Sequence, residues 1–359
     1  MAEFPSHPAD ITAGWLTDRL RGAGVISDAA ITAIRWEPIG TGQVGDSARL
    51  HLSYDRADGG PPSVVGKFPA EDQTSRATAT MFGLYRKEVG FYRELHQLLD
   101  VRVPQPYVAE ASEDGGDFLL IFEDLLPVRG GNQLDGCSLA DAREAVRQAA
   151  ALHAPSWGNP AITEADWLKV KPETVEMVRA LYVGGQTVFA ERYSDQLEPE
   201  YMAVCAGLAA AHADWIGRER GTRCLIHGDF RLDNMLFGLH GGNEAIAVLD
   251  WQTVAVGNAL TDLGYFMGCG IGRDLRRAHE GELLALYCAE MTRRGVPMTA
   301  ADIWTEYCIG ALHGVSTAVF SSAYVERTAR GDANFLSMAR GACDLALQHG
   351  SLDLLRKGS

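Results

Sequence analysis

The sequence has few cysteines, and none of them have the close spacing of a metal site. The seven cysteines are scattered along the 359 residues, and no two form a C-x-x-C pair. This distribution argues against a disulfide framework and against a structural zinc site, and it favours a reducing compartment. We therefore predict a cytoplasmic protein. The cysteines are Cys137, Cys205, Cys224, Cys269, Cys288, Cys308 and Cys343.

Patterns typical of targeting and membrane segments are also missing. The N-terminal stretch MAEFPSHPADITAGWL has no basic start followed by an apolar run, so we predict no signal peptide. The most apolar later stretch, residues 309–325, contains His313 and several small polar residues. It is short and polar for a membrane span, and we interpret it as a buried helix.

Basic residues are outnumbered by acidic ones. Lys and Arg total 32 and Asp and Glu total 47, which gives a net charge of −15. A general nucleic-acid binder needs clustered cations to neutralise phosphates, so we predict no nucleic-acid partner. The apolar fraction of 47% and the charged fraction of 22% are those of an ordinary globular protein.

The length predicts two lobes, because 359 residues exceed what one hydrophobic core usually serves. Strand patterns with one main helix, at 75–99, occupy residues 1–125, and helical patterns dominate residues 126–359. Pro127, Gly130 and Gly131 interrupt the pattern at the boundary. The sequence therefore predicts an α+β fold. The strands are predicted at 34–54 (two strands), 63–68, 107–111 and 118–122, and the later helices at 139–153, 200–217, 276–294, 301–325 and 334–349.

A glycine-rich stretch, GTGQVG, places Gly40, Gly42 and Gly45 at G-x-G-x-x-G spacing. Such glycines let backbone N–H groups approach an anion. The dinucleotide-binding form of this motif opens a helix, whereas residues 47–52 here have a strand pattern. The strand–loop–strand context favours a flap over nucleotide phosphates, with an ordinary glycine-rich hairpin as the alternative.

Lys67 lies within a short apolar strand, and Glu88 follows 21 residues later on a helical pattern. A strand-borne lysine that reaches nucleotide phosphates needs a carboxylate to fix its direction. Glu88 shares its helical face with apolar residues, whereas Glu94 lies on another face. The alternative is that Lys67 and Glu88 are two unrelated surface charges.

The polar stretch LIHGDFRLDNMLF, residues 225–237, lies between two strand-like segments, which we interpret as a hairpin. His227, Asp229 and Asn234 have the spacing of H-x-D-x-x-x-x-N. An Asp on such a loop can accept the proton of an attacking hydroxyl, and an Asn amide oxygen can hold Mg²⁺. We interpret His227 as a scaffold of the loop. Asp233 is either structural or a minor contributor near the metal.

An apolar strand, AVLDW, ends at Asp250, 16 residues after Asn234 and across a glycine-containing turn. This return of the chain predicts that Asp250 and Asn234 share a Mg²⁺ ion, because oxygen ligands and phosphates suit Mg²⁺ better than zinc. Asp262 lies at a helix start further on. We predict that it is structural and fixes the catalytic loop by accepting backbone N–H bonds.

Three segments resemble the aminoglycoside phosphotransferase and choline kinase type of small-molecule kinases. They are HGDFRLDN at 227–234, VLDWQ at 248–252 and GNALTDLGYF at 257–266. The segment KEVGFYRELH at 87–96 is similar to the ecdysteroid-kinase-like branch. The resemblance covers roughly residues 35 to 270, and the last ninety residues match only in being helical.

The resemblance implies a bilobal protein-kinase-like fold. A small antiparallel-sheet lobe, 1–125, would bind the nucleotide, and a larger helical lobe, 126–359, would carry the catalytic and substrate groups. ATP would bind at a hinge near Phe122 to Leu125 and transfer its γ-phosphoryl group to a hydroxyl. The implied residues are Asp229 as base, Asn234 and Asp250 as Mg²⁺ ligands, Lys67 with Glu88 for the phosphates, and Glu123 and Leu125 at the hinge.

Departures from protein kinases point to a small-molecule substrate. Gly228 stands where protein kinases have Arg, Trp251-Gln252 replaces Phe-Gly, and no Ala-Pro-Glu follows. Aminoglycoside kinases bind polycations through acidic residues toward the C-terminus. Here the acidic residues of 333–359 are only Asp344 and Asp353, which argues against an aminoglycoside substrate.

We therefore predict an alcohol kinase for a fairly apolar acceptor, which is steroid-like, lipid-like or a hydroxyacyl thioester. The alternatives are an aminoglycoside kinase and a nucleotide-binding regulator without catalysis, and a protein kinase is the least favoured reading. Aromatic residues of the later helices would line the acceptor pocket or belong to the core. They are Tyr265, Phe266, Trp304, Tyr307, Phe320 and Tyr324.

Overall fold

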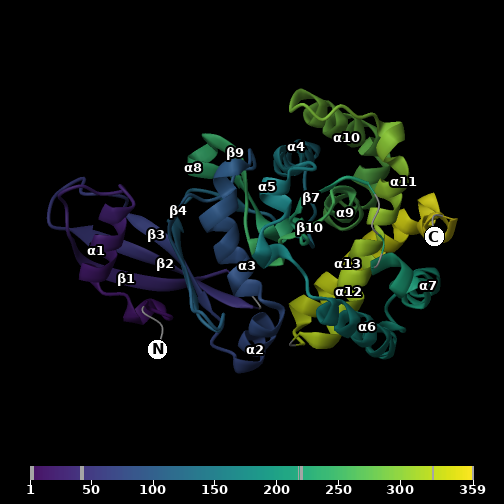
Figure 1. Ribbon diagram of the computed structural model, residues 1–359, viewed down its shortest axis with the longest axis horizontal. Coiled ribbons are helices and arrows are strands. Elements are labelled where there is room, and N and C mark those ends of the chain that lie inside the picture. The colour runs from purple at the N-terminus through teal and green to yellow at the C-terminus, as the bar shows by residue number, and fades with distance from the viewer. Residues whose placement is uncertain (1–3, 41–43, 217, 219–220, 326, 358–359) are drawn as a thin grey trace. The chain divides into compact units, whose positions relative to one another are not determined.

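The computed structural model describes residues 4–40, 44–216, 218, 221–325 and 327–357 (Figure 1). Contacts within the chain divide it into two compact units. The first unit comprises Met1–His96, Val103–Pro127 and Asp250–Gln252, and the second comprises Gln97–Arg102, Val128–Leu249 and Thr253–Ser359. The second unit thus includes a short segment before residue 125, and the first includes three residues around Asp250.

The first unit is built on a five-stranded antiparallel sheet with the order β1-β2-β3-β5-β4. Every strand predicted for residues 1–125 lies in this sheet, so the predicted antiparallel-sheet region is confirmed. The strands are β1 (Ile31–Ile39), β2 (Gly45–Tyr54), β3 (Ser63–Pro69), β4 (Pro106–Ala111) and β5 (Phe118–Glu123).

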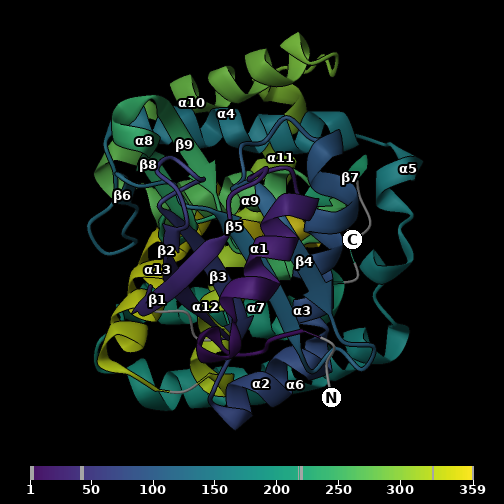
Figure 2. The same cartoon turned by 90° about the vertical axis from the view of Figure 1, so that its left-hand side faces the viewer.

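Helices cover both faces of this sheet. Helix α1 (Ala13–Gly22) begins after its N-cap Thr12 and lies over one face of the sheet (Figure 2). Leu16 and Leu20 of α1 share one hydrophobic core with Ile121 of β5. On the other face, Tyr85 of α3 stacks on Phe118 with ring centroids 4.3 Å apart. Side chains of β5 alternate between these two covered faces, which explains its almost entirely apolar sequence FLLIFE.

The predicted helix at 75–99 is broken into several pieces. Helix α2 (Gln73–Phe82) ends at Gly83, whose φ of 65° is left-handed, and α3 (Leu84–Gly90) begins directly after it. A π-helical turn (Phe91–Leu95) and a 3₁₀ turn (His96–Leu98) follow. The predicted inward face is confirmed, because the side chains at its four positions are buried, whereas Glu94 is exposed. These positions are Glu88, Phe91, Tyr92 and Leu95.

The second unit contains two small antiparallel sheets. One pairs β7 (Arg223–Ile226) with β10 (Ala255–Asn258), and the other has the order β6-β8-β9. The polar stretch leads from β7 to β8, so the predicted hairpin is wrong: its two flanking strands pair with other partners. Sequence analysis missed β6 and β10, because their sequences, RG and AVGN, lack the apolar run that marks β7. The second sheet consists of β6 (Arg129–Gly130), β8 (Met235–Gly238) and β9 (Glu244–Val248).

Helices make up most of the second unit, as predicted. Helix α4 begins at the predicted place, with a capping box formed by Ser138 and Asp141. The predicted helix at 301–325 is broken at Ala311 into α11 and α12. The main helices are α4 (Leu139–Ser156), α6 (Pro172–Tyr193), α7 (Pro199–Ile216), α9 (Leu260–Tyr265), α10 (Arg273–Arg293), α11 (Ala300–Gly310), α12 (Leu312–Tyr324) and α13 (Ala329–His349), with short α5 (Pro160–Thr163), α8 (Leu239–Gly242) and α14 (Ser351–Lys357).

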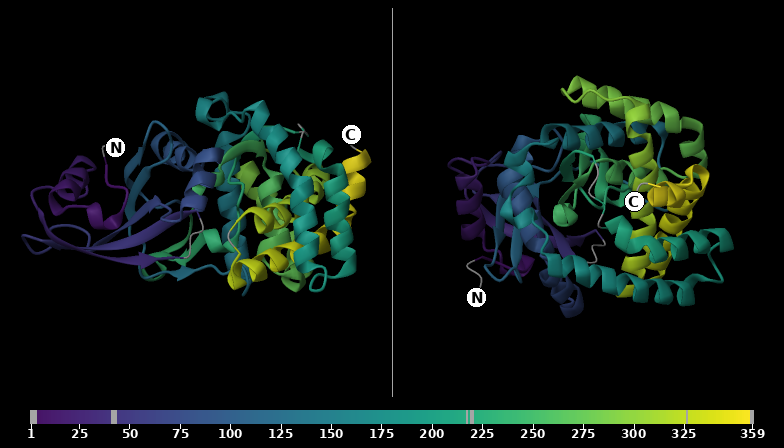
Figure 3. Two further views of the ribbon diagram at one scale, coloured as in Figure 1. Left: turned by 90° about the horizontal axis from the view of Figure 1, so that it is seen from below. Right: turned by 45° about the vertical axis from the view of Figure 1, so that its right-hand side comes forward.

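Helix α6 lies in a segment that carried no readable motif. Its 22 residues bury only a narrow stripe, while Val183 beside that stripe is exposed, so no apolar face stands out in the sequence. Helix α6 packs against α7 and α12, and α12 packs against α13 (Figure 3). These four helices share one hydrophobic core. No helix in the described part of the chain is long and apolar enough to cross a membrane.

Candidate active site

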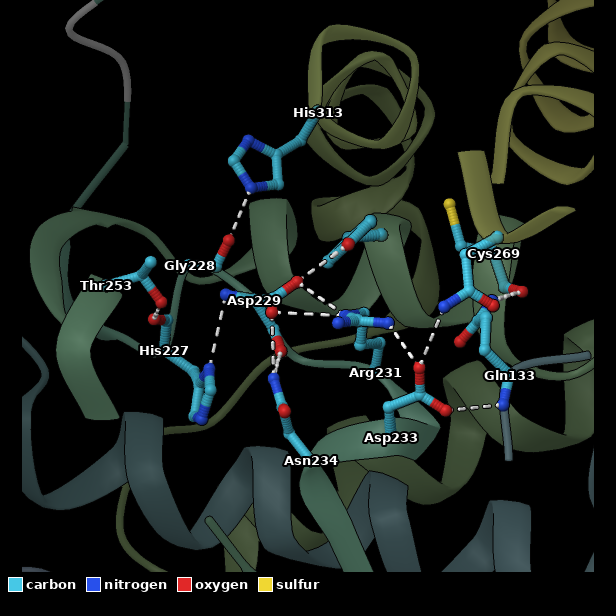
Figure 4. Close-up of polar contacts among 12 residues, drawn as sticks. Gln133, His227, Gly228, Asp229, Arg231, Asp233, Asn234, Thr253, Cys269 and His313 are labelled. Carbon is cyan, nitrogen blue, oxygen red and sulfur yellow. Dashed lines mark hydrogen bonds and ion pairs between the residues drawn. The ribbon is translucent and has the colours of Figure 1, made fainter. Parts of the chain in front are cut away.

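The Asp229 carboxylate is held by three side chains of the second unit (Figure 4). Arg231 donates from Nε to both carboxylate oxygens at 3.0 and 3.1 Å. The Tyr265 hydroxyl of α9 donates to Oδ1 at 2.8 Å, and Nδ2 of Asn234 donates to Oδ2 at 2.8 Å. These donors fix the direction of the carboxylate.

The same contacts keep Asp229 ionised. Burial raises the pKa of Asp229, but the Arg231 charge and the Tyr265 hydrogen bond outweigh burial, so the net pKa lies below its usual value. In return, burial and the Asp229 charge hold the pKa of Tyr265 well above its usual value, so the phenol remains a donor. Asp229 is therefore a carboxylate at neutral pH.

Asp262 supports the backbone of this loop. Its carboxylate accepts hydrogen bonds from the N–H groups of His227 (2.6 Å) and Gly228 (2.9 Å), and it lies 3.3 Å from Nε2 of His153. Asp262 is fully buried. Burial raises its pKa, but the hydrogen bonds from His153 and from the backbone N–H of His227 oppose burial, and the net pKa is lowered.

Gly228 has a φ of 80°, in the left-handed region, and a Cβ at this position would lie 2.7 Å from the Thr253 carbonyl oxygen. Only glycine fits both conditions without strain. The Gly228 carbonyl oxygen lies 2.7 Å from Nε2 of His313 on α12 (Figure 4). This backbone geometry is the physical reason that an arginine is absent before Asp229.

His227 acts within the loop. Its Nδ1 accepts a hydrogen bond from the N–H of Asp229 at 3.2 Å, so Nε2 carries the proton and donates to the Leu249 carbonyl at 2.8 Å. The imidazole thus joins the Asp229 loop to the end of the β9 segment. It is completely buried.

Asn234 belongs to the short helical turn Leu232–Asn234 and is buried. Its Nδ2 donates to the backbone oxygen of Asp229 at 2.9 Å as well as to its carboxylate. Both bonds use the amide nitrogen, so the amide oxygen can serve as a ligand. The carbonyl oxygen of Asn234 accepts from the N–H of Leu249 at 2.8 Å, and Asp250 follows Leu249 in the chain.

Sequence analysis missed Arg231 and left the role of Asp233 open between structural support and a minor contribution near the metal. Arg231 Nη1 donates to Asp233 at 2.7 Å, and Asp233 also accepts from the backbone N–H of Gln133 at 2.9 Å and from Nδ2 of Asn334 at 3.3 Å (Figure 4). Asp233 therefore ties the loop to distant segments through Arg231. The two-residue spacing of Asp229, Arg231 and Asp233 was the available sequence signal.

Lys67, Glu88 and Asp250 lie together in the first unit. Lys67 Nζ donates to both oxygens of Glu88 at 2.8 Å and to Asp250 at 3.0 Å. Burial lowers the pKa of Lys67, but the carboxylates of Asp250 and Glu88 outweigh burial and raise the net value above normal. Burial raises the pKa of Glu88, and the Lys67 ammonium opposes this shift. Lys67 is thus a charged ammonium fixed by two carboxylates.

The backbone also helps to direct Asp250. Its φ of 63° is in the left-handed region, an unusual conformation for a residue with a side chain. The next residue, Trp251, is fully buried and stacks on Phe91 with ring centroids 3.9 Å apart. This stack anchors the segment in the first unit.

The remaining predicted residues lie in the first unit. Gly40 follows β1 with a φ of 74°, and Gly45 opens β2, while Gly42 lies outside the described residues. Glu123 ends β5, where its Oε1 accepts from the N–H of Gln105 at 2.8 Å. Leu125 is buried just beyond.

The model of the phosphotransferase enzyme family matches residues 53–296, which is more than half of the chain. The chain belongs to the phosphotransferase enzyme family. This membership confirms the resemblance to small-molecule kinases that phosphorylate hydroxyl groups. The ecdysteroid-kinase-like branch stays a prediction, because the family match does not separate branches.

Solved structures of this phosphotransferase type share the fold. The GDP complex of wild-type aminoglycoside 2'-phosphotransferase-IIIa is 16% identical, with a TM-score of 0.50 over 91% of this chain and 93% of that chain. The GDP and kanamycin complex of APH(2")-IIIa is 15% identical, with a TM-score of 0.50 over 96% and 99%. At these identities the likeness shows the fold alone, and it confirms the predicted kinase-like fold.

A curated relative matches over a short segment. Acyl-CoA dehydrogenase family member 11 of Pongo abelii is 54% identical over 43 residues, which is 12% of this phosphotransferase. The match spans only 5% of the relative's own length.

The residues of this phosphotransferase fit the Mg²⁺ ion that the family implies. Asp250 has a carboxylate and Asn234 has an amide oxygen, and hard oxygen ligands are what Mg²⁺ requires. Across the described ranges, no group of three or more His, Cys, Asp and Glu side chains forms a metal site. Phosphate oxygens and water would supply the further ligands of such a site.

The aromatic residues predicted for an acceptor pocket divide into two groups. Tyr265, Phe266 and Tyr307 are completely buried, and Tyr265 contacts Asp229 directly. Trp304 and Tyr324 are 40% and 38% exposed. Phe320 is partly buried against the core of α6, α7, α12 and α13. The core interpretation therefore holds for Phe266 and Tyr307, whereas Tyr265 belongs to the site.

Proposed function

We propose that this enzyme transfers the γ-phosphoryl group of ATP to the hydroxyl of an apolar, uncharged alcohol, with Asp229 as the general base. The observation that carries the proposal is the Asp229 carboxylate, ionised and held by Arg231, Tyr265 and Asn234. A fixed carboxylate of this kind is what proton removal from a hydroxyl requires.

In the proposed reaction, the acceptor O–H donates its hydrogen bond to Asp229. The proton passes to the carboxylate as the acceptor oxygen forms a bond to the γ-phosphorus. The bond between that phosphorus and the bridging oxygen breaks, and the electron pair leaves with ADP. Asp229 then returns its proton to solvent. Atoms and charge balance without a covalent enzyme intermediate.

Lys67 is the proposed phosphate-binding cation. Glu88 is buried and holds the ammonium at 2.8 Å, so the direction of Lys67 is set before the nucleotide binds. Asp250 and Asn234 would hold Mg²⁺ through carboxylate and amide oxygens. A bound Mg²⁺ ion neutralises phosphate charge in such sites. We place Gly40, Gly42 and Gly45 over the phosphates, and Glu123 and Leu125 at the nucleotide base.

The charges of the C-terminal helices favour an uncharged acceptor. Asp344 is buried and accepts from Arg276 at 2.5 Å and Arg277 at 2.7 Å. Asp353 lies 3.5 Å from Arg356. Because both acidic residues of this segment already have cationic partners, they are poorly placed to bind a polycation. An aminoglycoside kinase remains the second candidate, since solved structures with this fold include aminoglycoside phosphotransferases.

Among the apolar alcohols we propose hydroxyacyl thioesters first, and the short match to acyl-CoA dehydrogenase family member 11 supports this choice. Such acceptors are chemically adjacent to acyl thioesters and carry a free hydroxyl. Steroid-like and lipid-like alcohols are the further members of the predicted class.

The test is nucleotide- and Mg²⁺-dependent phosphorylation across hydroxyacyl thioesters, sterols, choline-like amines and aminoglycosides, with ATP and GTP compared. Asp229→Asn is the matched control, because it keeps the shape of the side chain and removes the base. We expect a hydroxyacyl thioester or another apolar alcohol to react, and Asp229→Asn to lower kcat by about 10²–10⁴-fold while nucleotide binding survives. Nucleotide binding without phosphorylation of any acceptor would favour a regulator without catalysis.

A further inference from the structure

Buried polar atoms without hydrogen bonds gather on α6 and α7. Among the described residues they include Nε of Arg179, the hydroxyl of Tyr182, Oε1 of Gln186 and both ring nitrogens of His212. Arg179, Tyr182 and Gln186 are three and four residues apart, so they share one face of α6. Buried polar groups in folded proteins are normally paired, so this concentration indicates a missing partner.

His212 is the clearest member of this group. It is 3% exposed, and burial together with the Arg179 charge lowers its pKa to about 4. The imidazole is therefore uncharged at neutral pH, with one N–H donor and one acceptor nitrogen. Leaving both unpaired destabilises the free protein, a cost that proteins carry where function uses the group.

Tyr182 forms the second half of this group. Its ring is fully buried and stacks on His212 with centroids 3.7 Å apart and planes 7° apart. Its hydroxyl interacts with Ser316 of α12 without the geometry of a hydrogen bond. The stack fixes the orientation of the His212 ring, so its nitrogens have set directions.

A row of aromatic rings joins His212 to the Asp229 loop. Trp215 and His313 lie between His212 and Tyr265, and Tyr265 donates to Asp229 at 2.8 Å. Successive ring centroids are 5.6 Å apart for His212 and Trp215, 6.2 Å for Trp215 and His313, and 5.1 Å for His313 and Tyr265. The unpaired imidazole is thus connected to the proposed reaction site by contiguous packing.

We propose that His212, stacked on Tyr182, binds an uncharged oxygen group of the acceptor, such as a carbonyl or a second hydroxyl, remote from the hydroxyl that reacts. This proposal rests on the proposed function, because the ligand is the acceptor alcohol. A neutral imidazole can donate to a carbonyl and accept from a hydroxyl or an amide N–H. Apolar alcohols that also carry a carbonyl group, including hydroxyacyl thioesters, offer the acceptor that the N–H of this imidazole requires.

The surroundings disfavour a cationic ligand. The Arg179 charge already acts on His212, and the guanidinium pairs with Glu176 at 2.6 Å. The core shared by Tyr182 contains Leu208, Val315 and Val319. A polyamine brought to His212 would meet a positive charge and apolar side chains, which would leave its own charges unpaired.

The test compares His212→Phe with wild type in two measurements that need no turnover. The first is calorimetric binding of a hydroxydecanoyl N-acetylcysteamine thioester, with kanamycin as the polycationic probe. We expect the thioester to bind the wild type, His212→Phe to weaken that binding about tenfold, and kanamycin to bind neither protein. Thioester binding unaffected by His212→Phe, absence of thioester binding to wild type, or His212-dependent binding of kanamycin would each overturn the proposal.

The second measurement is thermal unfolding without ligand. Phe keeps the ring stack and removes the two unpaired nitrogens, so His212→Phe should unfold at the same or a higher temperature. Tyr193→Phe on α6 is the control, because the Tyr193 hydroxyl donates to Asp332 at 2.6 Å. That control should lower the unfolding temperature and leave thioester binding unchanged. A His212→Phe protein as destabilised as Tyr193→Phe would show that the imidazole has an internal partner, which overturns the proposal.

These outcomes are separable from failure of the proposed function. If the thioester binds through His212 but Asp229→Asn does not affect its phosphorylation, the base assignment fails and the binding site stands. If Asp229 is required for phosphorylation but His212→Phe leaves both KM and thioester binding unchanged, the base assignment stands and the proposed binding site at His212 fails.

Discussion

Nε of Arg231 donates hydrogen bonds to both carboxylate oxygens of Asp229, at 3.0 and 3.1 Å, while Nη1 of the same side chain donates to Asp233 at 2.7 Å. One guanidinium thus joins two acidic residues of the loop. The planar fork of Arg fixes direction as well as charge, which a lysine could not do in the same way. The orientation and the ionisation of the Asp229 carboxylate therefore depend on Arg231.

Replacing this guanidinium should change the pH dependence of the reaction. In Arg231→Gln, burial of Asp229 acts without the opposing positive charge, so the pKa of Asp229 should rise. Because the base must be ionised, the acidic limb of the kcat/KM profile should move to higher pH. Arg330→Gln is the control, since Arg330 reaches Asp233 at 3.5 Å. Identical profiles for wild type and Arg231→Gln would contradict this account of the loop.

Asp262 should stabilise the protein in a pH-dependent manner. Its lowered pKa means that it stabilises the fold above the unfolded pKa of about 3.9 and loses this effect as pH falls through the folded pKa. Asp262→Asn should lower the free energy of unfolding by about 1–3 kcal/mol at neutral pH, because it loses an acceptor for buried N–H groups. Urea unfolding should show that the difference narrows below about pH 4. Exposed Asp195→Asn should show neither effect, and a constant difference would refute the assignment.

Lys67 and Glu88 form a buried ion pair, so the effects of replacing the two residues on the free energy of unfolding should be coupled. Lys67→Met leaves the Glu88 carboxylate buried, with 2% of its side chain exposed, and should destabilise the protein by about 3–5 kcal/mol. Adding Glu88→Leu should restore part of that stability while activity stays lost. Chemical denaturation of the single and double variants measures this coupling. Additive losses in the double variant would mean that the pair is not coupled.

Gly228 should tolerate no side chain. Gly228→Ala would place a Cβ 2.7 Å from the Thr253 carbonyl oxygen at a φ of 80°, so we expect lower stability and a loss of activity. Gly281→Ala is the matched control, because Gly281 lies within α10 with open space around it. That control should raise stability by about 0.5–1 kcal/mol. Equal unfolding temperatures for the two variants would argue against a backbone constraint at Gly228.

Much of the local structure could be predicted because it leaves a periodic pattern. The inward face that contains Glu88 and Phe91, and the strand that carries Lys67, are visible in the sequence as apolar periods. The capping box of Ser138 and Asp141 marks the start of α4 directly. These features depend on residues that are close together in the chain.

Features that depend on distant residues could not be predicted in the same way. The segments flanking the polar loop were correctly predicted as strands, but their partners were not, because pairing of β7 with β10 depends on a return of the chain. The role of Arg231 and Asp233 depends on the fold, because Gln133 and Asn334, which donate hydrogen bonds to Asp233, are about 100 residues away in the chain. The unpaired nitrogens of His212 are a property of the packed core, which no local pattern encodes.

The central claim is that Asp229 accepts the proton of an alcohol during phosphoryl transfer. Its most direct test is ³¹P NMR detection of the phosphoester formed from a hydroxyacyl thioester and Mg·ATP, with wild type and Asp229→Asn compared under conditions in which both bind nucleotide. The account predicts a phosphoester with the wild type and about 10²–10⁴-fold slower formation with Asp229→Asn. Equal rates for the two proteins would contradict it.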